Sequence, residues 1–306
     1  MSNVFFRILV AIDESDASNE AVAFAARLAR EHDGQLIFCH SADWLPVITN
    51  LAESGMAGDT SEIIDDLKQE GEVLLDRAMR AAQRIGVHAQ RHLFEGNPAE
   101  RILEFAADAK CSLIVMGTHD RPALERLFVG STTEAVLRGS AVPVLTLRSG
   151  TKRTEATRRC FECIVVGTDE SEPSDAAIAT VLEWGPGERQ QVFFYCVAGV
   201  GDDEQEQARR VVHKALASAN ARGVSADGRV IGGNPGEALI TAAQQRSADL
   251  IVVGSHGRHG LQRLFLGSVA EHVVRNAPMP VLVVRTRESV PLASARTTTK
   301  HETSRV

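Results

Sequence analysis

The sequence has no apolar run long enough to cross a membrane. Among its 306 residues, no stretch approaches the roughly 18–20 apolar residues of a transmembrane helix. Residues Met1–Arg7 lack the basic, apolar and then small-residue order of a signal peptide. Basic residues are not in excess either, because 33 Lys and Arg stand against 40 Asp and Glu, giving a formal net charge of -7. We therefore expect a cytoplasmic protein with no nucleic-acid or membrane partner.

Cysteine is scarce as well, and the odd total of five does not fit a disulfide framework. Cys160 and Cys163 have Cys-x-x-Cys spacing. A zinc site would need two further ligands, and the sequence has no second Cys-x-x-Cys pair. A thioredoxin-type site would follow a strand and open a helix, whereas this pair precedes a predicted strand. We interpret the two cysteines as structural thiols and leave metal binding by them open.

The sequence contains a long internal repeat. Leu93–Arg148 aligns without gaps with Val230–Arg285, and Gly-Asn-Pro, Arg-Leu-Phe and Pro-Val-Leu recur at matching positions. The first strands also correspond, since Ile8–Ser15 resembles Ile164–Ser171. A repeat of this length indicates a duplicated domain rather than a solenoid unit.

The repeat predicts the domain organisation. We place a first domain at 1–148, a polar and basic linker at 149–159, a second domain at 160–288 and a disordered tail at 289–306. The offset between the halves falls from 156 residues at the first strand to 137 in the matched block, so the first half carries 19 residues more. We assign the extra chain to Trp44–Ile63.

Each half alternates short apolar segments with segments whose apolar residues recur at helical spacing. In the second half the predicted strands are Cys163–Gly167, Gln191–Val197, Ser225–Ile231, Leu250–Gly254 and Val281–Arg285. Several are apolar throughout, as expected for strands covered by helices on both faces. Crossover connections of this length favour a parallel, doubly wound sheet.

A glycine-rich loop carries the candidate chemistry of the second half. Gly254-Ser255-His256-Gly257 follows a strand, and nine residues later Gly267-Ser268 opens a helical segment. Phosphates bind where backbone amides converge without Cβ atoms in the way, and a helix N-terminus adds free amides and a positive dipole end. With strand order 3-2-1-4-5, Asp169 and Gly254 would end the two strands between which the order reverses, where ligands bind in such sheets.

Structural roles explain the same residues without a ligand. A glycine after a strand is common turn chemistry, Ser268 with Glu271 fits a capping box, and Asp169 could cap the following helix. The residues alone leave ligand binding and these roles open.

The motifs in combination resemble the universal stress protein family. The resemblance rests on Gly-x2-Gly-x9-Gly-Ser between Leu-Ile-Val-Val and Pro-Val-Leu-Val-Val, and on the opening Val-Val-Gly-Thr-Asp-Glu-Ser. It covers roughly residues 4–148 and 160–286. It implies an α/β fold of two tandem flavodoxin-like, adenine nucleotide α-hydrolase-like domains, each a doubly wound five-stranded parallel sheet of order 3-2-1-4-5.

The resemblance also implies a ligand. In ATP-binding members, the aspartate after the first strand lies at the adenine and ribose, a residue near the end of the second strand lines the base pocket, and the loop glycines and serine hold the phosphates. ATP is therefore implied in the second half, together with Mg²⁺ as a hard cation at the phosphates. The implied binding residues are Gly167, Thr168, Asp169, Val197, Val253, Gly254, His256, Gly257, Gly267, Ser268 and Val269.

The first half departs from this pattern. Its loop reads Gly117-Thr118-His119-Asp120, so Asp120 stands where the family has its second glycine, and Pro122 follows. A like charge beside a polyphosphate costs on the order of 1–4 kcal/mol. We predict that the first half binds ATP poorly or not at all, and leave open whether it supports the fold, binds a different ligand or forms a partner surface.

These features favour a nucleotide-responsive binding or regulatory module in stress resistance. The alternatives are a slow ATPase or nucleotidyl-transfer enzyme, and a purely structural pseudo-dimer; the sequence has no Walker Gly-x4-Gly-Lys-Ser/Thr motif and no obvious general base. Single domains of the family pair through the last strand. We therefore expect the halves to pair within the chain through Val144–Leu147 and Val281–Val284, with further homodimerisation left open.

Overall fold

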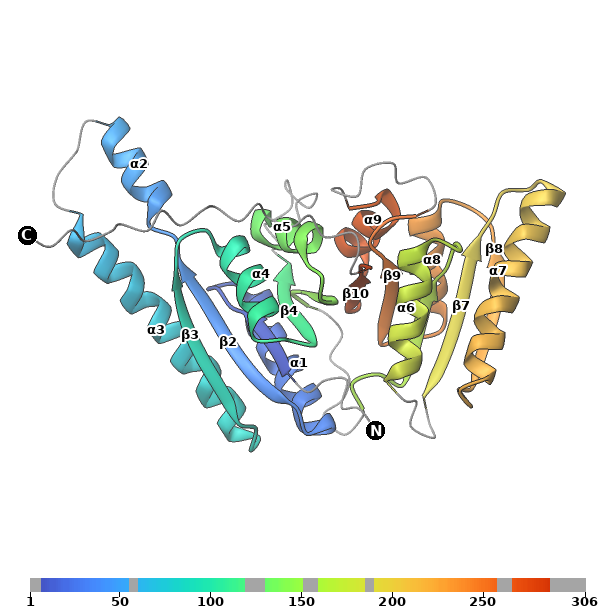
Figure 1. The fold of residues 1–306 in the computed structure, drawn as a ribbon, viewed down its shortest axis with the longest axis horizontal. Helices are drawn as coiled ribbons and strands as arrows, with labels where there is room; N and C mark the ends of the chain where they lie inside the picture. Colours follow the sequence, from blue (N-terminus) through green and yellow to red (C-terminus); the bar gives the residue numbers. More distant parts are fainter. Residues whose placement is uncertain are drawn as a thin grey trace, which may run out of the picture.

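The computed structural model describes residues 7–54, 60–118, 130–150, 159–184, 190–257 and 266–286, which form two α/β halves (Figure 1). The first half consists of β1 (Arg7–Ala11), α1 (Asp16–His32), β2 (Gln35–Ala42), α2 (Leu45–Glu53), α3 (Ser61–Arg84), β3 (Ala89–Glu95), α4 (Pro98–Asp108), β4 (Leu113–Thr118), α5 (Ser131–Gly139) and β5 (Val144–Arg148). The second consists of β6 (Cys163–Gly167), α6 (Glu172–Glu183), β7 (Gln191–Val197), α7 (Asp202–Asn220), β8 (Ala226–Ile231), α8 (Pro235–Gln245), β9 (Leu250–Gly254), α9 (Ser268–Asn276) and β10 (Val281–Val284).

The ten strands of the described chain form one sheet in the order β3-β2-β1-β4-β5-β10-β9-β6-β7-β8. Within each half the strands are parallel and follow the order 3-2-1-4-5, which confirms the predicted fold. β5 and β10 pair antiparallel, with Leu145 opposite Leu282. These are the two strands through which we expected the halves to pair. The two halves therefore share one continuous sheet.

Helices cover both faces of this sheet (Figure 1). Alternate strand residues point to opposite faces, so that Ile8 and Val10 belong to one buried cluster and Leu9 to another. The first cluster includes residues of α1, α3, α6 and α7, and the second includes residues of α4, α8 and α9. Burial on both faces explains why the predicted strands are apolar throughout.

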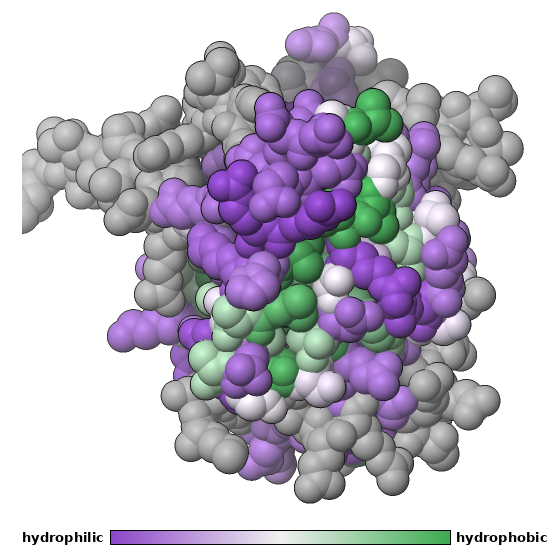
Figure 2. Space-filling view, turned by 90° about the vertical axis from the view of Figure 1, so that its right-hand side faces the viewer, coloured by the Kyte–Doolittle hydropathy of each residue, from purple (hydrophilic) through white to green (hydrophobic). Residues whose placement is uncertain are grey.

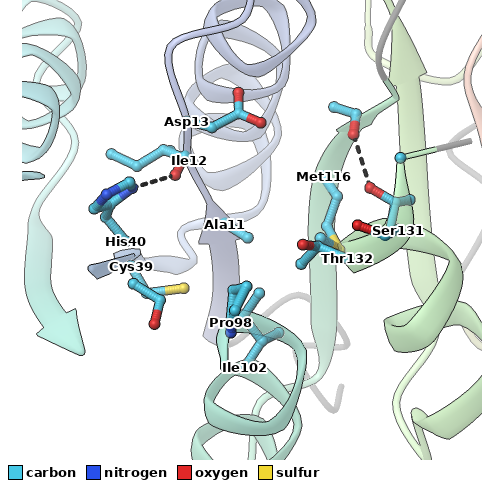
Figure 3. Close-up of a pocket in the computed structure, with 14 residues that line it drawn as sticks. Ala11, Ile12, Asp13, Cys39, His40, Pro98, Ile102, Met116, Ser131 and Thr132 are labelled. Carbon is cyan, nitrogen blue, oxygen red and sulfur yellow. Dashed lines mark hydrogen bonds between the residues drawn. The ribbon is translucent and has the colours of Figure 1, made fainter. Parts of the chain in front are cut away.

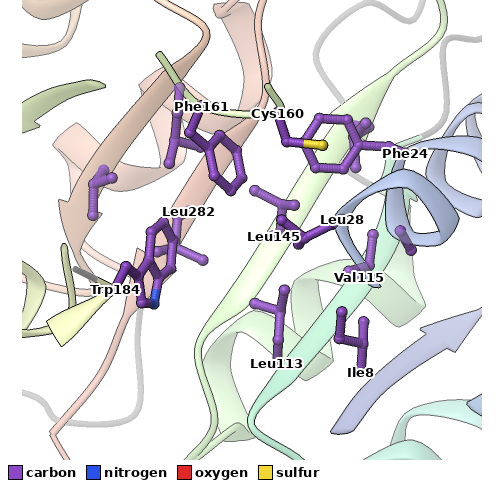
Figure 4. Close-up of a cluster of buried hydrophobic side chains, with 14 of the residues drawn as sticks. Ile8, Phe24, Leu28, Leu113, Val115, Leu145, Cys160, Phe161, Trp184 and Leu282 are labelled. Carbon is purple, nitrogen blue, oxygen red and sulfur yellow. The ribbon is translucent and has the colours of Figure 1, made fainter. Parts of the chain in front are cut away.

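An aromatic cluster lies where the two halves meet (Figure 4). The Phe161 ring stacks on Trp184 with 5.4 Å between centroids and lies 5.5 Å from the Phe24 ring of α1. Leu145 and Leu282 from the paired strands belong to the same cluster. The apolar layer on this face is therefore continuous across the junction.

The Cys-x-x-Cys pair is divided between the two faces. Cys160 is buried in the aromatic cluster of Figure 4, and its backbone N–H donates to Glu31 Oε2 at 2.8 Å. Cys163 packs against the opposite cluster. Burial raises the pKa of the Cys160 thiol to about 12. The two thiols therefore do not converge on a shared site.

The extra chain of the first half lies between β2 and α3. It forms α2 and part of α3, which has 24 residues where its counterpart α7 has 19. α2 has no buried residue and projects beyond the body of the first half (Figure 1). The middle of the segment predicted for the insertion, at 55–59, lies outside the described residues, as do the predicted tail at 289–306 and most of the predicted linker.

The recurring Gly-Asn-Pro motif starts a helix in each half. Asn97 and Asn234 are the N-caps of α4 and α8, and each is followed by proline at the first helical position. The preceding Gly96 and Gly233 have φ of 97° and 109°, a conformation that favours glycine. The motif therefore turns the chain from β3 or β8 into the next helix.

Strand β8 forms one edge of the sheet. Figure 2 faces this end of the molecule and shows apolar surface between strongly hydrophilic surfaces. Asp227 and Arg229 on β8 form an ion pair with 3.7 Å between their charged atoms, and charged side chains on an edge strand disfavour pairing with another sheet. None of the described helices combines the length and apolarity needed to span a bilayer.

Candidate functional site

The residues predicted to bind a ligand in the second half surround one cavity of about 570 Å³. The cavity lies at the carboxyl ends of β6 and β9, between which the strand order reverses. All eleven predicted residues line it: Gly167, Thr168 and Asp169 at the end of β6, Val197 at the end of β7, Val253, Gly254, His256 and Gly257 at and after the end of β9, and Gly267, Ser268 and Val269 at the start of α9.

A tight turn after β6 fixes the Asp169 carboxylate. Asp169 Oδ1 accepts from the backbone N–H of Ser171 at 3.0 Å and from its hydroxyl at 2.6 Å. Ser171 caps α6 by accepting from the N–H of Ser174, so the interpretation of Asp169 itself as the cap is wrong. Glu170, between them, has a φ of 70°, which is uncommon for a residue with a side chain. The turn thus holds Asp169 facing the loop after β9.

The approach of Asp169 to that loop leaves little space for a side chain at position 257. A Cβ added to Gly257 would lie 2.6 Å from Asp169 Oδ2, well inside van der Waals contact. The two segments are also joined at Ser171, whose Oγ lies 3.3 Å from the carbonyl oxygen of His256. Gly257 therefore leaves room beside the carboxylate on the cavity wall.

The loop after β9 is fastened to the sheet and to α9. The N–H of Ser255 donates to the carbonyl of Val284 at 2.8 Å, and the N–H of Gly267 donates to the carbonyl of Ser255 at 2.7 Å. A Cβ on Gly267 would lie 2.9 Å from His256 Cα, so glycine is needed here for the helix to begin against the loop. These contacts set the position of the α9 N-terminus at the cavity.

Gly254 has a structural explanation that applies to both halves. A Cβ at Gly254 would lie 2.7 Å from both the carbonyl carbon of Pro173 and the nitrogen of Ser174 in the first turn of α6. Gly117 approaches α1 in the same way, because a Cβ there would lie 2.6 Å from the nitrogen of Ser18. The first glycine of the loop is thus required for the strand to pass close to the preceding helix.

The N-terminus of α9 presents backbone amides to the cavity. Gly267 is the N-cap and receives no side-chain capping bond, and the first amides of a helix have no partner within it. The predicted capping box is wrong, because Ser268 follows the cap and Glu271 instead forms an ion pair with Arg275 at 2.5 Å. Free amides and the positive dipole end favour an anionic ligand group at this place.

Backbone groups rather than cationic side chains provide the anion-binding potential of the described lining. Asp169 provides the carboxylate of this lining, and the lining contains no Lys or Arg at the described positions. The ring of His256 contacts its neighbour, because its Nδ1 lies 3.0 Å from Ser255 Oγ. Arg258 and Arg263, which follow Gly257 in the loop, lie outside the described residues. The described part of the chain contains no cluster of three His, Cys, Asp or Glu residues suited to a metal ion.

Six further residues line the cavity that the sequence motifs did not identify: Ser171, Ser174, Tyr195, Pro235, Leu239 and Ala270. Tyr195 precedes Val197 by two residues, and side chains two apart on a strand share a face. The prediction that Val197 lines the cavity therefore also implied that Tyr195 lines it. The Tyr195 hydroxyl accepts from Arg246 Nε at 3.1 Å. Tyr195 and Leu239 contribute apolar surface to the lining.

The first half contains a cavity of about 510 Å³ at the corresponding place (Figure 3). It lies at the ends of β1, β2 and β4 and at the start of α5. Asp13 corresponds to Asp169 and makes the same turn, because its Oδ1 accepts from the N–H of Ser15 at 2.9 Å. Asp120, predicted to spoil phosphate binding, lies outside the described residues.

The sheet and its cavities define a protein of two doubly wound α/β units, each with a cavity where the strand order reverses. The model of the universal stress protein family matches residues 5–148 and 197–285, and the chain therefore belongs to this family. The predicted family resemblance is confirmed.

Individual relatives agree with a tandem arrangement. A universal stress protein of Mycolicibacterium smegmatis is 28% identical over 305 residues, which cover 92% of this chain and 98% of the relative. One from Methanocaldococcus jannaschii is 35% identical over 150 residues, covering 49% of this chain and 86% of the relative. The crystal structure of a universal stress protein from Archaeoglobus fulgidus has a TM-score of 0.71 at 21% identity and covers 92% of this chain and 96% of its own, a likeness of fold.

Proposed function

We propose that this universal stress protein is a nucleotide-responsive binding module that takes ATP, with Mg²⁺, in its second half. The observation that carries the proposal is the convergence of all eleven predicted binding residues on one cavity where the strand order reverses. Its volume of about 570 Å³ lies within the range of about 300–1,000 Å³ typical of small-molecule sites.

The cavity offers different chemistry at its two ends. Tyr195, Val197 and Leu239 line an apolar region suited to a purine ring. The Asp169 carboxylate can accept hydrogen bonds from ribose hydroxyls, since a carboxylate is an acceptor with several lone pairs. The amides at the start of α9 would bind the phosphates, where Mg²⁺ would neutralise part of their charge.

Binding rather than catalysis is supported by the described side chains. Asp169 is the carboxylate of the described lining, and its Oδ1 already accepts two hydrogen bonds from Ser171. We assign this carboxylate to the ribose rather than to the reacting phosphate. Phosphoryl transfer needs a group that positions the attacking nucleophile, and no described lining residue at the phosphate end is an acid or a base other than His256.

The proposal assigns the nucleotide to one half. By sequence, Asp120 of the first half takes the place of Gly257. In the second half, a side chain at that place would project toward Asp169 Oδ2. A carboxylate there would add negative charge to a site that already contains one. We therefore expect ATP in the second half and not in the first.

The test is a thermal unfolding titration of the full chain with Mg-ATP. At a ligand concentration 100 times Kd, binding stabilises the native state by about 2.7 kcal/mol, which corresponds to roughly 5–10 °C for domains of this size. Asp169→Asn should remove most of the shift, whereas Asp13→Asn, the matched change in the first half, should leave it. No shift for the wild-type chain, or equal loss in both variants, would contradict the assignment.

A further inference from the structure

Tyr195 stands at the boundary between the second cavity and the apolar core beside α8. Phe193, Tyr195 and Val197 share one face of β7, because side chains two apart on a strand point the same way, and all three belong to or pack against one apolar cluster. Tyr195 and Val197 line the cavity, whereas Phe193 lies further from the carboxyl end of the strand. Side chains in strands lean along the strand in either of two common rotamers. The Tyr195 ring can therefore point toward the cavity or away from it.

In the structure the Tyr195 ring points away from the cavity. Its hydroxyl accepts a hydrogen bond from Arg246 Nε at 3.1 Å, and the residue is only 5% exposed. Arg246 is the C-cap of α8, whereas Pro235, at the start of the same helix, lines the cavity. A helix of 11 residues is about 16 Å long. The hydroxyl is therefore directed at the end of α8 that lies farther from the cavity.

Arg246 is itself held in place by neighbouring strands. Its guanidinium carbon lies 4.0 Å from the centroid of the Phe193 ring, a cation–π contact. Its Nη2 lies 3.5 Å from Oδ2 of Asp227, the β8 residue that pairs with Phe193. Its backbone carbonyl accepts from the Cys163 thiol at 3.6 Å. These contacts fix the donor to which the Tyr195 hydroxyl is bound.

The first half has the same fold without any of these side chains. The strand registers of the two halves identify the equivalent positions. The replacements are Ile37 for Phe193, Cys39 for Tyr195, Gln90 for Asp227 and Ala109 for Arg246. Strand order and helix positions nevertheless agree between the halves. The fold does not require the arginine, which occurs in the half where a tyrosine lines the cavity.

Loss of Arg246 would favour the other direction of the ring. The Tyr195 hydroxyl would be left buried with no partner, which disfavours the observed position. A ring turned toward the cavity would lie beside Val197, Pro235 and Leu239, which line it, and its hydroxyl would reach water. The turned ring would occupy the apolar region that we assigned to the purine.

We propose that Arg246 is a positioning residue for the nucleotide site, which keeps the second cavity open by holding the Tyr195 ring toward the far end of α8. Arg246 acts through Tyr195 and does not line the cavity. The inference rests on the proposed function, since ATP is the ligand for which the space is kept.

The test is a double-mutant cycle measured by isothermal titration calorimetry of the full chain with Mg-ATP. Arg246→Met keeps an apolar stem over Phe193 and removes the donors. It should raise the Kd by about tenfold or more, because a hydrogen bond from a charged donor no longer opposes the closed state. Tyr195→Cys copies the first half and has no ring to turn. In that background Arg246→Met should change the Kd by less than about twofold.

Each outcome of the cycle decides the role of Arg246. A loss of equal size in both backgrounds would show that Arg246 supports α8 rather than the ring, and would overturn the proposal. A Kd within twofold of the wild-type value in Arg246→Met would also overturn it. Circular dichroism identifies a variant that fails to fold, in which case Arg246→Ala, the residue type that the first half has at this place, takes its place in the cycle.

A second measurement follows the ring without depending on nucleotide. Tyr195 is the only tyrosine of the chain, so 3-fluorotyrosine labelling gives one ¹⁹F signal, and the change in its chemical shift between H₂O and D₂O increases with exposure of the ring to water. We expect a larger change in nucleotide-free Arg246→Met than in the wild-type chain. An unchanged value would overturn the proposal. A wild-type chain that binds no Mg-ATP would contradict the proposed function, and the ¹⁹F comparison would then decide alone whether Arg246 holds the ring.

Discussion

Substitution of Gly257 by aspartate would give the second half the residue that the first half has at this place. A Cβ at position 257 would lie 2.6 Å from Asp169 Oδ2, so the Asp169 side chain must move, and the new carboxylate would stand beside the phosphates. Two unit charges about 4 Å apart interact by about 1 kcal/mol at the dielectric constant of water and about 4 kcal/mol at an effective value of 20. The Kd for Mg-ATP should therefore rise by roughly 5- to 1,000-fold.

Isothermal titration calorimetry of the full chain measures this change. Gly257→Asn has nearly the same shape without the charge and should weaken binding less than Gly257→Asp, and Gly257→Ala isolates the contact of the Cβ alone. Because the neighbouring atom belongs to a side chain that can rotate, all three variants should remain folded. If Gly257→Asp binds Mg-ATP within twofold of the wild-type protein, the reasoning about this loop is wrong.

Three further changes test the stability of the fold. Gly254→Ala should lower the free energy of unfolding by about 1–3 kcal/mol, because the new Cβ would lie 2.7 Å from the α6 backbone; an unchanged urea midpoint would refute this. Phe161→Ala should cost about 3–5 kcal/mol, since the ring is buried between Trp184 and Phe24, and a loss below about 1 kcal/mol by the same titration would show that this cluster does not join the halves. Burial lowers the pKa of His32 below its ordinary 6.5, so below pH 6.5 the unfolded chain binds a proton that the native chain does not, and stability falls as the pH drops. His32→Gln should make the unfolding free energy less dependent on pH between about 5 and 7, and an identical pH profile would contradict the assignment.

The fold could be predicted largely because the sequence contains it twice. Apolar runs of strand length alternate with helical spacing, and the predicted strand Ser225–Ile231 is β8, Ala226–Ile231. The antiparallel direction of the β5–β10 pair was not specified, since short apolar strands carry no signal for the direction of a partner. α2 was also not predicted, although Leu45, Ile48 and Ala52 recur at helical spacing; the helix buries none of its residues.

The site was predicted from residues that follow strands, and those residues do meet. Gly254 illustrates where the reasoning was incomplete: it was chosen for phosphate access, but its close approach to α6 alone requires a glycine. Pro235 and Leu239 line the cavity although they come from α8, whose position depends on packing across the sheet. Ser171 was passed over because its cap and its bond to Asp169 depend on a local turn that the strand pattern does not reveal.

The most direct measurement is the number of Mg-ATP molecules bound per chain, determined by equilibrium dialysis of the full-length protein with radiolabelled nucleotide. We expect one, lost in Asp169→Asn and retained in Asp13→Asn. A value of two would show that the first half accepts the nucleotide in spite of Asp120, and a value of zero would show that the cavity between β6 and β9 serves another purpose.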